Sequence, residues 1–348
     1  MKDIFRILEK SYIYELFEKK KLVYFPETEN KSSHLKRCED KKITLIEIEK
    51  NSPDWAKETC LAKYKIFFED ETYKVVRGTA SVSESKEKAW QIMNFLYGQG
   101  FDEGGLLIAR PLDFIKDANL LLYEEAQGTP LSLIIQDKNS SELEGFLERT
   151  AEWLAKLHGC NFKKETDFPP AVFIKKNEYS KIFAQIINLI PGLRNVLVFN
   201  SELEFIDEIS DGQKTLIHND FYPGNIIVGQ EIIYGIDFEK SGYGLRLMDV
   251  ATFLGWFDFP QQIREANFSE KEISNFQKFF LAAYCRSCRL ERAEIERTLN
   301  KYLAKIFLDQ VYNYAIIYVK GRNYFSSEDK INYERKIKAL VQKVRQHF

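Results

Sequence analysis

Alternating apolar and polar positions between residues 43 and 78 predict β-strands in the first part of the chain. Three such runs cover Ile43–Glu49, Leu61–Phe68 and Tyr73–Gly78, and the short polar turn between the second and third predicts a hairpin. Upstream, apolar residues at helical spacing predict a helix over residues 3–20, which a polar loop at residues 26–42 separates from the first strand. The chain therefore begins, by prediction, with a helix and a small antiparallel sheet.

Helical spacing returns after the third strand. Ser83 or Ser85 can serve as the N-cap of a helix whose apolar residues share one face and whose end is marked by glycines. A buried strand follows and leads into a polar, glycine-containing stretch at Glu124 to Gly128. This stretch is expected to be a hinge, because the periodicity on its two sides differs.

The chain beyond the hinge is mainly helical by its pattern. A strongly amphipathic helix is predicted at residues 143–160, and residues 260–348 keep helical periodicity. The expected fold class is therefore α+β. A small β-rich N-lobe would cover residues 1–124, and a larger, mainly helical C-lobe would cover residues 125–348.

The composition narrows the possible partners. The 348 residues are 45% hydrophobic and 29% charged, with a net charge of −2, which gives no electrostatic reason to expect nucleic acid or an anionic membrane. The charged N-terminal segment lacks the apolar core of a signal peptide, and no apolar run approaches the roughly 20 residues of a membrane span. We expect a cytoplasmic protein with neither a nucleic-acid partner nor a membrane span.

Candidate chemistry is concentrated in the stretch "HNDFYPGNIIVGQEIIYGIDF", residues 218–238. His218, Asp220 and Asn225 have the spacing of a kinase catalytic loop, H-x-D-x-x-x-x-N, and Asp237 follows after a strand-like run. Phosphoryl transfer needs a carboxylate to orient the attacking hydroxyl and oxygen ligands to hold Mg²⁺ against the phosphates. The alternative is a polar turn between two strands, with Asp220 and Asn225 as turn residues.

These motifs resemble those of the aminoglycoside phosphotransferase and choline kinase-like family, the small-molecule kinases with a two-lobed, protein-kinase-like fold. Three further segments carry the resemblance: "LLLYEEAQG" is similar to the hinge between the lobes, "LAKLHG" to a Leu-Ala-x-Leu-His helix, and "GLRLMDVA" to the step after the metal-binding Asp. The resemblance extends over about residues 40–290.

The resemblance implies roles for individual residues. Asp220 would be the catalytic base, Asn225 and Asp237 the Mg²⁺ ligands, and Glu124 and Ala126 the hinge residues against the nucleotide, ATP or GTP. It also implies that the two histidines of these motifs and one acid buttress the catalytic loop. They are His158, His218 and Asp249. By its sequence position, Asp249 could equally be the N-cap of the next helix.

The first part of the chain departs from the family pattern on the third strand. Kinases place there a Lys that holds the phosphates and pairs with a Glu on the next helix. Here Arg77 falls in that register and Lys74 is the other candidate, on the opposite strand face. Arg77 is expected in the cleft, with Glu87 its first expected partner and Glu84 the second. For each of these residues, the alternative is an ordinary charged side chain on the strand or helix that is exposed to solvent.

Two other departures concern the first strand connection and the metal-binding acid. The connection has no glycine, so Ser52 is the candidate that could donate a hydrogen bond to a phosphate. Asp237 is followed by "FE", where kinases have "FG". These departures leave open a pseudokinase, a nucleotide-binding or scaffold protein with little or no catalysis.

The charge of the C-terminal helices bears on the acceptor. Residues 261–348 carry 17 Lys and Arg against 10 Asp and Glu. Because a polycationic antibiotic needs an acidic pocket, this balance favours a small neutral or anionic hydroxyl compound.

Overall fold

The computed structural model describes residues 4–25, 41–51, 58–82, 85–137, 140–160, 170–171, 173–174, 176–190, 193, 214–259 and 268–347. The contacts within the chain divide it into two compact units. Unit 1 consists of Met1–Gln127 and Tyr234–Glu239, and unit 2 of Gly128–Ile233 and Lys240–Phe348. Each unit is described by itself.

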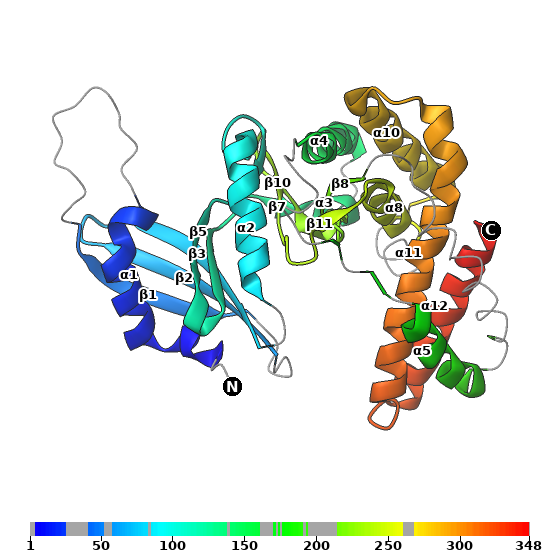
Figure 1. Ribbon diagram of the computed structural model, residues 1–348, viewed down its shortest axis with the longest axis horizontal. Helices are drawn as coiled ribbons and strands as arrows, with labels where there is room; N and C mark the ends of the chain where they lie inside the picture. Colours follow the sequence, from blue (N-terminus) through cyan, green and yellow to red (C-terminus); the bar gives the residue numbers. More distant parts are fainter. Residues whose placement is uncertain are drawn as a thin grey trace. The chain divides into compact units, whose positions relative to one another are not determined.

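An antiparallel five-stranded sheet is the frame of unit 1, with the strand order β1-β2-β3-β6-β5 (Figure 1). Its strands are β1 (Ile43–Lys50), β2 (Thr59–Phe68), β3 (Tyr73–Ser81), β5 (Pro111–Ile115) and β6 (Leu120–Glu124). The predicted hairpin of β2 and β3 is confirmed, with Tyr64 opposite Val76. β6 pairs with β3, with Tyr123 opposite Arg77, and leads into the stretch Glu124 to Gly128 that the sequence predicts as a hinge.

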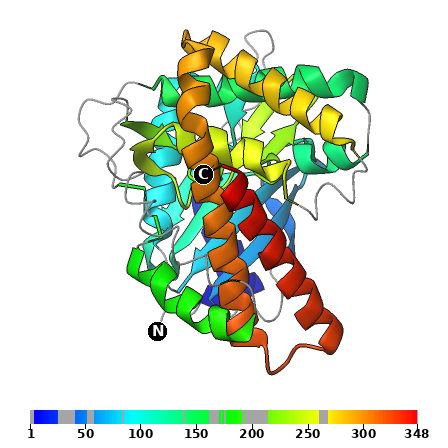
Figure 2. The same cartoon turned by 90° about the vertical axis from the view of Figure 1, so that its right-hand side faces the viewer.

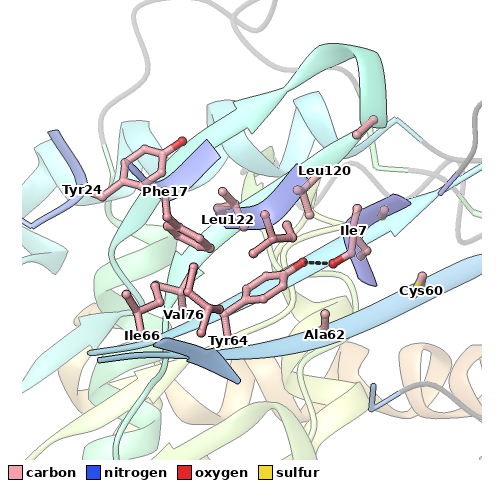
Figure 3. Packing of buried hydrophobic residues seen from close by; sticks show 14 of the residues in the cluster. Ile7, Phe17, Tyr24, Cys60, Ala62, Tyr64, Ile66, Val76, Leu120 and Leu122 are labelled. Carbon is pink, nitrogen blue, oxygen red and sulfur yellow. Dashed lines mark hydrogen bonds between the residues drawn. The ribbon is translucent and has the colours of Figure 1, made fainter. Parts of the chain in front are cut away.

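The N-terminal helical segments pack their apolar faces on the sheet of unit 1. The predicted N-terminal helix is broken into a 3₁₀ turn, η1 (Ile4–Leu8), and a helix, α1 (Lys10–Tyr24). Both pack on a cluster of buried side chains that includes Phe17, Tyr64, Val76 and Leu122 (Figure 3). Within this cluster the Tyr64 hydroxyl donates to the Ile7 carbonyl at 2.9 Å, as the dashed line in Figure 3 marks.

The predicted helix after β3 is α2 (Lys86–Leu96), which contacts β3, β5 and β6. Ser85 is its N-cap and accepts from the Glu87 N–H, which decides between the two predicted caps; Ser83 lies outside the described residues. Further short elements are η3 (Tyr97–Phe101), β4 (Leu106–Ile108) and η4 (Lys116–Ala118). The sequence pattern did not predict β4 and β5, because they are short and only partly buried.

Short strands and a helical bundle make up unit 2. Its strands are β7 (Thr129–Pro130), β8 (Lys214–Ile217), β9 (Ile226–Val228) and β11 (Gly242–Leu245), and β10 (Ile233–Gly235) begins at its boundary. Its helices are α3 (Leu131–Gln136), α4 (Ser140–His158), α5 (Lys176–Leu189), η7 (Pro223–Asn225), α8 (Leu247–Trp256), α10 (Glu270–Cys288), α11 (Arg292–Gly321) and α12 (Ser327–Gln346). The predicted helical C-terminal region is confirmed over its described part.

The three long C-terminal helices pack on the rest of unit 2. Figure 2 shows α12 running beside α11, while α10 packs on α4 and α8 packs on α11. Ser269 and Ser326 start α10 and α12 with reciprocal capping boxes, which satisfy the first N–H groups of both helices. Among the helices that the structure describes, none has the length and apolar character to cross a membrane.

Candidate active site

The loop that carries His218, Asp220 and Asn225 lies in unit 2, between β8 and β9. β8 pairs with β11, with Ile217 opposite Gly242, so the loop leaves a strand that is held in a sheet. Phe221, in the middle of the loop, is fully buried and its ring stacks on Trp153 with centroids 5.7 Å apart. This apolar anchor inside a polar segment fixes the loop on α4.

A buried carboxylate holds the backbone of the same loop. Asp249 is 0% exposed and accepts the backbone N–H of His218 and that of Asn219, each at 2.7 Å. Asn219 has a left-handed backbone (φ 61°), which Asn tolerates better than most residues. The N-cap of α8 is Arg246, so the alternative that Asp249 caps this helix is wrong. Asp249 buttresses the loop.

The two histidines of the sequence motifs are also part of this framework. The His158 ring joins Asp249 at 3.1 Å through Nε2 and the Tyr284 hydroxyl at 2.8 Å through Nδ1. His218 is 0% exposed, and its carbonyl accepts from the Ser241 hydroxyl at 3.0 Å. Burial raises the pKa of Tyr284 well above its ordinary value, so its hydroxyl stays protonated. These contacts support the loop instead of facing a substrate.

Asp220 and Asn225 come together at the loop's end. The 3₁₀ turn η7 places Asn225 so that its side-chain nitrogen donates to the Asp220 carbonyl at 2.9 Å. The Asp220 side chain is 27% exposed, and its carboxylate meets the Lys240 ammonium at 3.0 Å. Sequence reasoning missed Lys240, and the available signal was a basic residue three positions after Asp237.

Asp237 belongs to unit 1, together with the hinge and the third strand. Its side chain is exposed, its backbone is left-handed (φ 66°), and the neighbouring Phe238 is buried. Burial raises the pKa of Tyr123 in β6, and the nearby charge of Asp237 raises it further. The acid therefore lies within electrostatic reach of the strand that leads into the hinge.

The third-strand residues differ from the prediction. Arg77 pairs with Glu125, which Lys63 also meets at 3.2 Å, whereas Glu87 is exposed on α2. The predicted pair of Arg77 with Glu87 is therefore wrong, and the partner of Arg77 is Glu125. Because β6 pairs with β3, Glu125, which directly follows β6, lies beside Arg77. Lys74 is exposed.

The remaining predicted residues have these positions. Glu124, at the end of β6, bonds through its side chain to Arg110 at 3.2 Å, and its backbone N–H donates to the Arg110 carbonyl at 2.9 Å. Ala126 follows in the predicted hinge segment, within unit 1. The predictions on Ser52 and Glu84 fall outside the described residues.

Asn225 and Asp237, the two predicted Mg²⁺ ligands, carry oxygen atoms of the kind that a hard cation binds. Asn225 uses its amide nitrogen on Asp220, which leaves the amide oxygen as the atom that a metal could meet, and Asp237 offers an exposed carboxylate. Carboxylate and amide oxygens are the ligands that Mg²⁺ prefers, with water and phosphates completing the octahedron. Within the described ranges no three or more His, Cys, Asp or Glu side chains form a metal cluster.

An antiparallel sheet with helices packed on it, together with a helical unit that carries a buttressed H-x-D-x-x-x-x-N loop, is typical of the class of kinase-like phosphotransferases. A sequence profile of the phosphotransferase enzyme family matches residues 65–289, more than half of the chain, and the chain belongs to this family. The predicted family and the predicted protein-kinase-like fold are thus confirmed. No curated protein sequence matches the chain significantly.

Solved structures with this fold are similar to the chain over nearly its whole length. An amicoumacin kinase in complex with AMP-PNP and Ca²⁺ is 16% identical with a TM-score of 0.62, covering 94% of this chain and 93% of its own. Choline kinase from Cryptosporidium parvum is 14% identical with a TM-score of 0.62, covering 97% and 96%. Ethanolamine kinase from Plasmodium vivax is 18% identical with a TM-score of 0.58, covering 87% and 84%. At such low identities, the structural similarity establishes the fold alone.

Proposed function

We propose that the protein is an ATP-dependent kinase that transfers the γ-phosphate to a hydroxyl of a small molecule. Asp220 is the base, and Asn225 and Asp237 hold Mg²⁺. The observation that carries the proposal is the buried Asp249 carboxylate, which fixes two backbone N–H groups just before Asp220 while the Asp220 carboxylate stays partly exposed. A simple polar turn has no need of a buried acid beneath it.

Asp220 acts on the acceptor hydroxyl. Its carboxylate orients the O–H group and takes the proton as the new oxygen–phosphorus bond forms; the bond to the β-phosphate oxygen breaks and ADP leaves with its electrons. In the absence of substrate the Asp220 carboxylate pairs with Lys240, which is 63% exposed. Because an exposed ion pair contributes little, about 0–1 kcal/mol, an acceptor hydroxyl can replace Lys240 at small cost.

The nucleotide is assigned to unit 1. Glu124 and Ala126 form the hinge beside β3, and the proposal gives them the contacts to the nucleotide base, with Arg77 and Lys74 as the phosphate candidates that the sequence offers. A bound Mg²⁺ would neutralise phosphate charge. The AMP-PNP and Ca²⁺ named for the amicoumacin kinase support a nucleotide and a divalent cation.

The charge of the C-terminal helices bears on the acceptor. Their excess of Lys and Arg favours a neutral or anionic hydroxyl compound over a polycation. The need for ATP places the protein, by this proposal, in the cytoplasm.

A thermal-shift experiment tests the nucleotide and metal parts. A non-hydrolysable ATP analogue should stabilise the protein more with Mg²⁺ than with EDTA; at 100 times the dissociation constant the stabilisation is about 2.7 kcal/mol. Asp237→Asn should remove most of the Mg²⁺-dependent part, whereas Asp102→Asn, a matched change at an exposed acid of the same unit, should keep it.

Equal stabilisation with and without Mg²⁺ would instead favour the second candidate, a pseudokinase that binds nucleotide without catalysis. The observation behind that candidate is the pairing of Arg77 with Glu125, which leaves the third strand without the lysine–glutamate pair of active kinases.

A further inference from the structure

Among the residues of unit 1 that the structure describes, one buried lysine is not used by the mechanism above. Lys86 is the first residue of α2 and is 1% exposed, although it lies between exposed Ser85 and Glu87. Lysine is almost never fully buried unless it is paired. It lies on the inward face, one turn before Ala89, and is the fully buried ionisable residue of α2.

A buried asparagine fixes the backbone of Lys86. The Asn119 side chain accepts the Lys86 N–H at 3.0 Å and donates to the carbonyl of Ser81, the last residue of β3, at 2.5 Å. Asn119 is 4% exposed and has a left-handed backbone (φ 47°). The start of α2 is thereby tied to the end of the third strand, so the lysine is held in place.

The side chain of Lys86 reaches the segment that carries the metal-binding acid. Its ammonium forms an ion pair with Glu239, which is 25% exposed, and the Thr79 hydroxyl of β3 donates to the same carboxylate at 3.4 Å. Beyond this pair, Lys86 Nζ makes no hydrogen bond to the residues that the structure describes. An ammonium has three N–H groups, so donors remain for a further partner.

Glu239 lies two residues after Asp237, so the Cα atoms of the two acids are separated by at most about 7 Å, the span of two residues in an extended chain. The charges of both acids raise the pKa of Tyr123, so both acids lie within electrostatic reach of β6 in the same unit. The two cations expected to hold phosphates are placed differently, since Arg77 is engaged by Glu125 and Lys74 is exposed. Lys86 is thus the buried cation next to the metal-binding segment.

We propose that Lys86 is the residue that binds the phosphates of the nucleotide, and that Glu239 is the residue that positions it. The usual kinase arrangement, a lysine on the strand and a glutamate on the helix, is reversed: the lysine comes from α2 and the acid from the segment after Asp237, where kinases have glycine. This inference rests on the proposed function. It accounts together for the arginine at the register position of the third-strand lysine and for the "DFE" sequence.

Calorimetric binding of AMP-PNP and of adenosine, both in EDTA, tests the assignment without metal or turnover. Lys86→Met should weaken AMP-PNP binding about 10- to 100-fold, the range of hydrogen bonds to charged groups, and leave adenosine binding unchanged. Lys86→Arg should restore most of the AMP-PNP affinity. Lys88→Met, the same change at a partly buried lysine two residues along α2, should keep both affinities within about threefold.

A second variant separates binding from folding. Lys86→Met leaves Glu239 without its cation, so Lys86→Met/Glu239→Gln removes both charges and should fold while still losing AMP-PNP affinity. Wild-type AMP-PNP affinity in the double variant would make the pair purely structural and overturn the proposal. So would a phosphate-specific loss in Arg77→Met with none in Lys86→Met. If the wild type binds AMP-PNP and either of these two contrary results is obtained, only this inference fails. If the wild type binds neither AMP-PNP nor adenosine, the proposed function fails as well.

Discussion

Replacing Asp249 by asparagine is the sharpest test of how the catalytic loop is held. The carboxylate accepts two backbone N–H groups at 2.7 Å each, and bonds to a charged group contribute about 1.5–3 kcal/mol apiece. An amide of the same shape keeps one oxygen, which contributes about 1 kcal/mol, and turns an NH₂ group toward the other donor. Asp249→Asn should therefore lower the free energy of unfolding by about 2–5 kcal/mol.

Urea unfolding followed by tryptophan fluorescence measures this loss, because Trp153 stacks on Phe221 of the same loop. Asp137→Asn, at an exposed acid of the same unit, is the matched control and should stay within about 0.5 kcal/mol of the wild type. A change of that small size for Asp249→Asn would refute the reasoning, because a buried acceptor of two N–H groups cannot be lost so cheaply.

Two further predictions concern the frames of the two units. Tyr64→Phe should cost unit 1 about 1–3 kcal/mol of unfolding free energy, because the buried Ile7 carbonyl loses its donor; a urea midpoint equal to the wild type would contradict this. Gly128→Ala should destabilise unit 2, since Gly128 has a φ of 146° and an added Cβ would lie 2.2 Å from the Val228 carbonyl oxygen; an unchanged melting temperature would show that β7 and β9 are not so closely apposed.

The features that the sequence predicted best are those that depend on residues close together in the chain. The spacing from His218 to Asn225 lies in one loop between two short strands, and the β2–β3 hairpin needed only its alternation and its turn. Both depend on short, continuous segments: eight residues for the loop, 218–225, and the two adjacent strands of the hairpin, Thr59–Phe68 and Tyr73–Ser81. For the same reason Ser83 and Ser85 were sound alternatives for the N-cap, and only coordinates could choose Ser85.

Ion pairs between distant segments could not be predicted. Strand alternation indicated that Lys74 and Arg77 face opposite sides, but it could not identify Glu125, 48 residues further on, as the partner of Arg77. Likewise Lys86 sits between exposed residues in a charged stretch, and nothing local distinguishes it from Lys88. Its burial follows from Asn119 and Glu239, which the fold brings to the start of α2.

The central claim, that the protein is a small-molecule kinase with Asp220 as its base, is tested most directly by phosphorus NMR. The protein is mixed with ATP, Mg²⁺ and a panel of neutral and anionic hydroxyl compounds, and phosphate-ester formation is compared between the wild type and Asp220→Asn. A general base typically contributes 10² to 10⁴-fold, so the variant should fold, keep its nucleotide affinity within a few-fold and form the ester slower by about that factor. Ester formation at the wild-type rate by Asp220→Asn would contradict the account.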